Sequence, residues 1–150
     1  SRVEGAFFRL FRGGGGVGIL LGIFITVLVQ SSSITTSLLV PMIGAGILPL
    51  DGAFAITLGA NVGTTVTALL ASTAGTHDAV AIALVHLLFN VFGILLIYPV
   101  PAIRGVPIWL AQQLATLSMR SRMVPLLYLL FLFFLLPGII ILGQRLFGGA

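Results

Sequence analysis

The fold is decided by residues 30–37, QSSSITTS, a run of hydroxyls and one amide between two apolar segments, residues 17–29 and 38–43. A polar cluster inside such an apolar chain costs free energy unless it is paired or binds a ligand. A second polar cluster, residues 61–67 (NVGTTVT), interrupts the next apolar segment. We interpret the rest of the chain as a scaffold that brings these two clusters together.

The composition is that of an integral membrane protein. Of the 150 residues, 59% are hydrophobic and 7% are charged, whereas soluble domains carry about 25% charged residues. This length suits about four to six membrane elements in one domain. The absence of cysteine excludes disulfides and thiolate metal ligands. The seven basic residues are arginines in short polar gaps, where they orient a membrane protein, so no nucleic-acid partner is expected.

The first polar cluster is predicted to be the tip of a re-entrant helical hairpin over residues 17–44. A helix over residues 17–29 would reach about 20 Å, short of the ~30 Å hydrocarbon core. The alternative is one long helix from Val17 to Ile43 with a polar stripe. A hairpin places six arginines on one side and only Arg145 on the other, whereas a single crossing divides them four to three. Positive charge gathers on the cytoplasmic side, which favours the hairpin, although two full crossings would give the same sidedness.

The other segments complete an all-α membrane fold. Residues 52–72 can cross the membrane, but Gly59, Asn61, Gly63 and three threonines at their middle predict a discontinuous helix broken near residues 61–64. Pro137 and Gly138 are expected to kink the last helix. The remaining expectations are an interfacial amphipathic arm and glycine joint (residues 1–16), a spanning helix (79–98), an interfacial segment (99–123) and a second spanning helix (124–150). Residues 17–98 would then form one structural unit, and the arm and the 99–123 segment would lie on the cytoplasmic side of the cell membrane.

Hydrolytic chemistry is not expected, because nucleophilic catalysis needs a base within hydrogen-bond reach of the nucleophile. The serines lie at the hairpin tip, whereas His77 and Asp78 lie in an outer turn. No cluster of histidines and acids could hold a catalytic metal. We therefore expect that the protein is not an enzyme.

Ion binding suits the two polar clusters better. Helix ends inside a membrane attract anions at exposed N–H groups and cations at exposed carbonyls. Hydroxyls can donate to an anion or offer oxygen to Na⁺, and Gln30 and Asn61 add amide oxygens. No charged residue lies near either cluster, so a bound dianion would need co-bound cations. The alternative is that these side chains only join helix to helix by hydrogen bonds.

His86 and Asn90 are one helical turn apart and share a face. An ionisable residue inside a membrane is a candidate for function. We expect this pair to hydrogen-bond neighbouring helices rather than to contact a ligand directly.

Three motifs in this order, QSSS at residues 30–33, GANVGTTVT at 59–67 and HLLFN at 86–90, resemble the type II sodium-dependent phosphate cotransporter family. Members of that family carry two such repeats of inverted topology, which form one substrate site. This chain has one copy and looks most like the second repeat of a bacterial member. The resemblance therefore implies one half of an inverted-repeat transporter, which needs a second repeat from elsewhere in its chain or from another copy in an oligomer.

The resemblance also implies roles for individual residues. It implies sodium binding by Gln30, Ser31, Thr64 and Thr67; phosphate binding by Ser32, Ser33 and Asn61; and supporting roles for Gly63, Thr65, His86 and Asn90. Ala60 departs from the family pattern, in which a serine is common at this position. No cofactor is implied besides Na⁺ as the coupling ion. The expected function is sodium-coupled phosphate transport; the alternatives are a membrane scaffold or regulatory module, and a sodium-coupled carrier of another anion.

Overall fold

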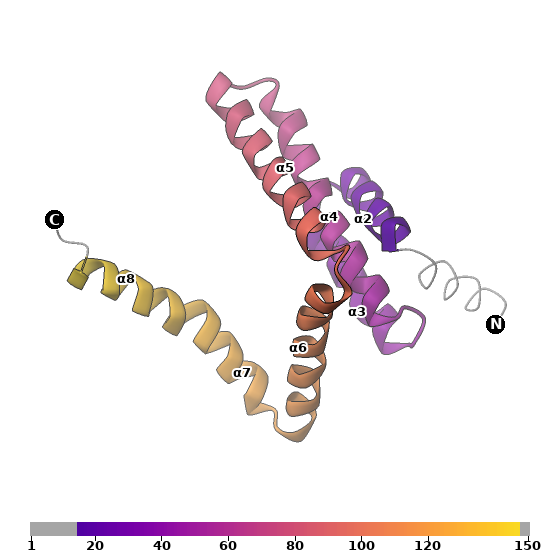
Figure 1. The fold of residues 1–150 in the computed structure, drawn as a ribbon, viewed down its shortest axis with the longest axis vertical. Coiled ribbons are helices and arrows are strands. Elements are labelled where there is room, and N and C mark those ends of the chain that lie inside the picture. Colours follow the sequence, from indigo (N-terminus) through magenta and orange to yellow (C-terminus); the bar gives the residue numbers. More distant parts are fainter. Residues whose placement is uncertain (1–14, 148–150) are drawn as a thin grey trace. The chain divides into compact units, whose positions relative to one another are not determined.

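The structure is a computed structural model that describes residues 15–147, and its regular elements there are all helical (Figure 1). The chain divides within α6 into two compact units, residues 1–108 and 109–150. Nearly all of the predicted interfacial arm lies outside the described residues. The elements are α2 (Gly15–Val29), α3 (Ser32–Gly44), α4 (Leu50–Ser72), α5 (His77–Ile97), α6 (Pro101–Arg120), α7 (Met123–Leu130), the π-helical segment η1 (Phe131–Leu135) and α8 (Leu136–Phe147).

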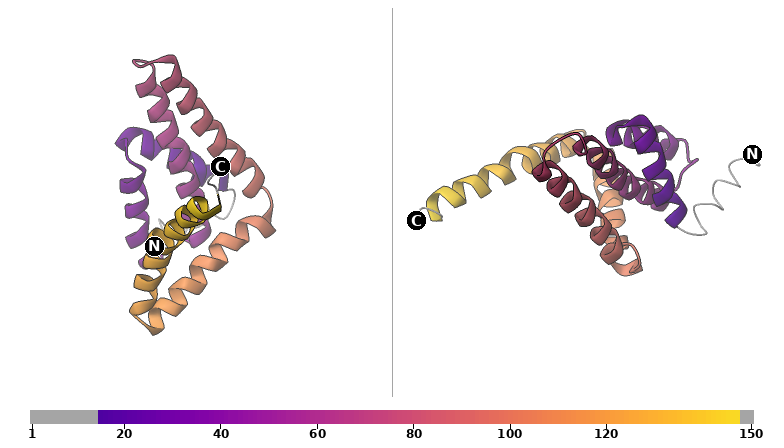
Figure 2. Two further views of the ribbon diagram at one scale, coloured as in Figure 1. Left: turned by 90° about the vertical axis from the view of Figure 1, so that its left-hand side faces the viewer. Right: turned by 90° about the horizontal axis from the view of Figure 1, so that it is seen from above.

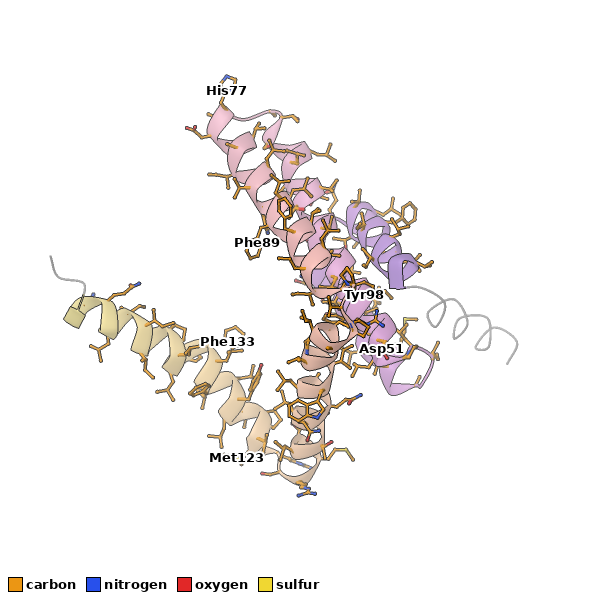
Figure 3. The ribbon with its side chains drawn as sticks, in the orientation of Figure 1. Asp51, His77, Phe89, Tyr98, Met123 and Phe133 are labelled. Carbon is orange, nitrogen blue, oxygen red and sulfur yellow. The ribbon has the colours of Figure 1, made fainter. Side chains whose placement is uncertain are left out.

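Three helical stretches are long and apolar enough to cross a membrane: α4, α5 and the continuous stretch Met123–Arg145. Many of their large apolar side chains are exposed, as expected where lipid is the solvent. Phe89 on α5 and Phe133 on η1, for example, point away from their helices in Figure 3. The chain is therefore an all-helical integral membrane protein, as its composition predicts.

The first polar cluster separates two helices. Gln30 has φ of 55°, a left-handed conformation that ends α2. Ser31 is extended (φ −152°) and caps α3, because its Oγ accepts a hydrogen bond from the backbone N–H of Ile34 at 3.3 Å. The alternative of a single helix over residues 17–43 is thereby excluded. The chain turns at Gln30–Ser31. On α3, which follows the turn, Leu39 packs with Ile56 in the core of this unit.

Helices α2 and α4 run parallel and touch backbone to backbone (Figure 2). The buried residues of α2 are small and four residues apart: Gly18, Gly22 and Thr26. A Cβ atom at Gly22 would collide with the carbonyl oxygen of Ile56, and one at Gly59 would collide with the backbone of Ile19. Small residues at this spacing allow membrane helices to approach closely, and this contact forms the centre of the first unit.

The predicted break in the helix over residues 52–72 is wrong, because α4 is continuous from Leu50 to Ser72. Gly59 and Gly63 are packing positions against α2 rather than points where the helix opens. The threonines do not disrupt the helix either, since their hydroxyls bond to carbonyls one turn earlier in the same helix. Three threonines and two glycines in one segment are thus compatible with an unbroken helix.

Helix α5 lies beside α4 and returns in the opposite direction (Figure 1). It begins at Thr76, whose hydroxyl accepts a hydrogen bond from the N–H of Ala79. Near its end the guanidinium of Arg104 stacks 5.3 Å from the centre of the Tyr98 ring. This helix corresponds to the predicted spanning helix over 79–98.

The second unit has a local irregularity just before Pro137. Residues Phe131–Leu135 are π-helical, and the N–H of Leu136 bonds to the carbonyl of Phe131, five residues earlier. Proline lacks an N–H and clashes with the preceding turn, and the π-helical segment ends two residues before Pro137. The π-helical segment is a local irregularity beside Pro137 and Gly138, and the kink predicted at these two residues stays a prediction.

Candidate ion site

A pocket of about 520 Å³ lies between the end of α2 and the second half of α4. Three of the four residues predicted to bind sodium, Gln30, Thr64 and Thr67, line it. The other lining residues are apolar: Val27, Ala68, Leu70 and Ala71. Ser31, the fourth predicted ligand, does not line this pocket and is half-buried as the cap of α3. The hairpin turn and the middle of α4, 34 residues apart at Gln30 and Thr64, thus meet at one place.

The threonine hydroxyls in this pocket can present oxygen lone pairs to a ligand, but they have no free proton to donate. Thr64 Oγ1 donates to the carbonyl of Ala60 at 3.1 Å, and Thr67 Oγ1 donates to the carbonyl of Thr64 at 2.8 Å. Each hydroxyl proton is therefore used within α4, and the oxygen lone pairs remain for a ligand. A ligand that needs electron-pair donors, such as a hard cation, suits this arrangement better than an anion.

The N-terminus of α3 has the opposite character. Ser32 and Ser33 occupy its first two positions, directly after the Ser31 cap. The first N–H groups of a helix have no partner within the helix and carry partial positive charge. Ser33 is exposed and Ser32 is half-buried, so hydroxyl donors lie beside these N–H groups. This end of α3 is suited to an anion.

Asn61 does not line the pocket, although it lies on the same side of α4. It precedes Thr64 by three residues, and residues three apart on a helix are neighbours on one face. Asn61 is exposed, whereas Ala60 and Val62 on either side of it are buried. Its side chain is therefore on an open face of α4, one turn from the cation-suited hydroxyls.

Two of the predicted supporting residues are packing residues. Gly63 faces α2, where an added Cβ would lie 2.7 Å from the Cβ of Thr26. Thr65 is fully buried, and its hydroxyl donates to the carbonyl of Val62 at 2.7 Å. Neither residue lines the pocket formed by Gln30, Thr64 and Thr67.

The predicted pairing of His86 and Asn90 with neighbouring helices stays a prediction, because the described bond of Asn90 lies within its own helix. Asn90 Nδ2 donates to the backbone carbonyl of His86 at 3.1 Å, within α5 itself. His86 is exposed and lines a second pocket of about 500 Å³ between α4 and α5. His77 lies at the tip of the α4–α5 turn (Figure 3). Among the described residues, no three His, Asp or Glu side chains gather where they could hold a metal.

Two threonines that the sequence did not single out as ligands connect the hairpin. Thr26 and Thr35 are 0% and 2% exposed. Thr26 Oγ1 donates to Thr35 Oγ1 at 2.9 Å, and Thr35 Oγ1 donates to the carbonyl of Ser31 at 3.0 Å. The signal was available, because Gly18, Gly22 and Thr26 form a four-residue repeat that is typical of a helix interface.

Comparison with known proteins assigns a family. Residues 6–136 match the family model described as Na⁺/Pi-cotransporter. The chain is similar to sodium-dependent phosphate transport protein 2C of Mus musculus, with 45% identity over 139 residues, which cover 90% of this chain and 23% of the relative. It is similar to sodium-dependent phosphate transport protein 2B of Homo sapiens, with 43% identity over 143 residues, which cover 90% and 21%. The chain thus spans less than a quarter of the length of these relatives. No solved structure matches it.

Proposed function

The chain belongs to the Na⁺/Pi-cotransporter family, and from this premise we propose that it supplies one half of the ion and phosphate site of a sodium-coupled phosphate transporter. The family match over residues 6–136 carries this proposal, because the relatives are described as sodium-dependent phosphate transport proteins. The other half of the site comes from a second repeat, either elsewhere in the same protein or in another copy of an oligomer.

Sodium is bound at the pocket lined by Gln30, Thr64 and Thr67. Two observations support this assignment. The hydroxyl protons of both threonines are used within α4, so their oxygens face a ligand as electron-pair donors. Gln30, in its left-handed conformation at the end of α2, is exposed and adds an amide oxygen. Ser31, the fourth proposed sodium ligand, follows Gln30 directly and caps α3.

Phosphate is bound beside the N-terminus of α3, with Ser32 and Ser33 as donors, and Asn61 on the exposed side of α4 is its third ligand. Helix N-termini bind phosphate because their N–H groups and dipole favour negative charge. The part of the site that this chain supplies contains no cationic side chain, so the neighbouring Na⁺ would offset part of the charge of a dianion. This charge balance explains why phosphate and sodium would move together.

The α2–α3 pair is a re-entrant hairpin whose tip lies near the middle of the membrane. Helices of 15 and 13 residues are about 22 and 20 Å long, which is short of the ~30 Å hydrocarbon core. An irregular turn is tolerated at that depth where protein or a wet cavity covers it. Transport proceeds by alternating access, in which the repeats move around a site near the midplane. The protein lies in the cell membrane, with residues 99–123 on the cytoplasmic side.

The test is radiolabelled phosphate uptake into proteoliposomes that contain the full-length protein bearing this chain. An inward Na⁺ gradient should drive uptake, and an equal K⁺ gradient should not. Gln30→Ala should raise the Na⁺ concentration for half-maximal uptake about tenfold or more, because a ligand of the cation is lost. The exposed Gln113→Ala on α6 is a matched control that should behave as the unmodified protein does.

Uptake that is equal in Na⁺ and K⁺ would contradict sodium coupling. Unchanged sodium dependence in Gln30→Ala would contradict the site assignment. Competition by a carboxylate in place of phosphate would favour the carrier of another anion, and absence of uptake under every gradient would favour a scaffold or regulatory module.

A further inference from the structure

We propose that Thr26 and Thr35 are positioning residues that set the sodium affinity of the pocket, although neither one lines it. The inference rests on the proposed function, and it assigns to two buried hydroxyls a role in holding the Gln30–Ser31 turn against α4.

Thr26 is held against α4 through its methyl group. A Cβ added at Gly63 would lie 2.7 Å from the Cβ of Thr26 and 3.1 Å from its Cγ2. There is thus no free space between these two residues. Together with the backbone contact of Gly22 with Ile56, this fixes the last turns of α2 relative to α4.

The hydroxyl of Thr26 holds α3. It donates to Thr35 Oγ1 at 2.9 Å, which in turn donates to the carbonyl of Ser31 at 3.0 Å. The same carbonyl accepts the N–H of Thr35 at 3.2 Å. The peptide group that follows the turn is therefore held by two bonds from Thr35, and Thr35 is held by Thr26. In a buried, low-dielectric setting, consecutive hydrogen bonds of this kind strengthen one another.

This junction lies one helical turn from the pocket on both helices. Gln30 directly follows the last residue of α2, four residues after Thr26, so a shift of the last turn of α2 moves it. Thr67 follows Gly63 by four residues on the same face of α4, so a shift at the junction reaches both sides of the pocket. Gln30 is the more sensitive side, because it lies outside α2, in the turn that Thr35 holds through the carbonyl of Ser31.

A hydroxyl that acts only through packing would behave differently in a transport assay. Loss of packing lowers the amount of folded protein and hence the maximal rate. Loss of positioning raises the Na⁺ concentration for half-maximal uptake while the maximal rate at saturating Na⁺ remains. The isosteric change of threonine to valine removes the hydroxyl and retains the shape, and threonine to serine retains the hydroxyl.

The matched control is Thr57→Val on α4. Thr57 is half-buried, and its hydroxyl donates to the carbonyl of Ala53 at 2.9 Å within its own helix. Its loss removes one hydrogen bond of the same kind but leaves the Gln30–Ser31 turn untouched. Any effect common to all three valine variants is therefore a general effect of the substitution.

The experiment measures sodium-dependent phosphate uptake by the full-length protein in proteoliposomes, together with hydrogen exchange of the amides of residues 32–36 without Na⁺. Thr35→Val loses both bonds of the relay and should raise the half-saturating Na⁺ concentration about fivefold or more, and Thr26→Val about twofold to threefold. Thr26→Ser and Thr35→Ser should stay within about twofold of the unmodified protein, because they retain the hydroxyl. Exchange of the amides of residues 32–36 should be faster in Thr26→Val and Thr35→Val and unchanged in Thr57→Val.

The inference is overturned if Thr26→Val and Thr35→Val have the sodium dependence of Thr57→Val, or if exchange at residues 32–36 does not change. Either result leaves the proposed function in place, as long as the unmodified protein transports phosphate with Na⁺. If the unmodified protein shows no sodium dependence, the proposed function is wrong and the inference is wrong with it. Should Thr35→Val fail to assemble in the membrane, Thr26→Val decides the question by the same criterion.

Discussion

Helix α4 and the stretch Met123–Arg145 are equally long, but they are built for different surroundings. Each has 23 residues, and 44% of an 18-residue apolar window of α4 is buried within the structure, against 0% of such a window in Met123–Arg145. The less apolar helix is the more buried one, which is the reverse of the rule for soluble proteins. Within a membrane, small residues and hydroxyls mark the faces that touch other helices, because lipid is as apolar as leucine.

The largest effect on stability is expected from a substitution at a position where two helix backbones touch. Gly22→Ala should lower the stability of the folded protein by about 3 kcal/mol, because the new methyl group meets the carbonyl of Ile56 and rigid backbone cannot move aside cheaply. Gly93→Ala on α5 is the control, since a Cβ there meets nothing within 4 Å, and it should change stability by less than about 1 kcal/mol. Thermal unfolding in detergent measures both, and equal effects would show that the α2–α4 contact is not as close as described.

A smaller difference in stability is expected between the replacement of a buried leucine and that of an exposed leucine. Leu48 is 2% exposed, so Leu48→Ala should lower stability by about 2 to 4 kcal/mol through the cavity that it leaves. Leu129 is 48% exposed, and Leu129→Ala should cost less than about 1 kcal/mol, because lipid replaces the lost contacts. Unfolding by denaturant in mixed micelles compares the two variants. A Leu129→Ala cost as large as that of Leu48→Ala would mean that this part of the chain packs against protein.

The hydropathy pattern predicted where the helices lie better than it predicted which of them are unbroken. Segment length placed a turn at Gln30–Ser33, and the structure has one at Gln30–Ser31. The same reasoning failed at Asn61–Thr64, because polar and small residues predict both a helix break and a helix interface. A helix interface differs from a helix break in that its hydroxyls bond to carbonyls of their own helix, as Thr64 does. The sequence alone does not show which of the two arrangements forms.

The candidate site was predicted in part. The resemblance to a known family selected Gln30, Thr64 and Thr67, which do line one pocket. Without that resemblance, the residue pattern alone could not rank Thr64 above Thr65, because adjacent residues point to different sides of a helix and the direction depends on where α2 packs. The four-residue repeat of Gly18, Gly22 and Thr26 indicates a helix interface, but it does not show that Thr26 contacts both Gly63 on α4 and Thr35 on α3.

The neighbours Thr64 and Thr65 provide the most direct test of the central claim, which is that the pocket at the hairpin turn binds sodium. Both hydroxyls bond within α4, but Thr64 lines the pocket and Thr65 is fully buried on another side. In sodium-dependent phosphate uptake, Thr64→Val should raise the half-saturating Na⁺ concentration about tenfold, and Thr65→Val should leave it within about twofold while lowering stability by about 1 kcal/mol. Equal sodium dependence in the two variants, or a larger shift in Thr65→Val, would contradict the claim.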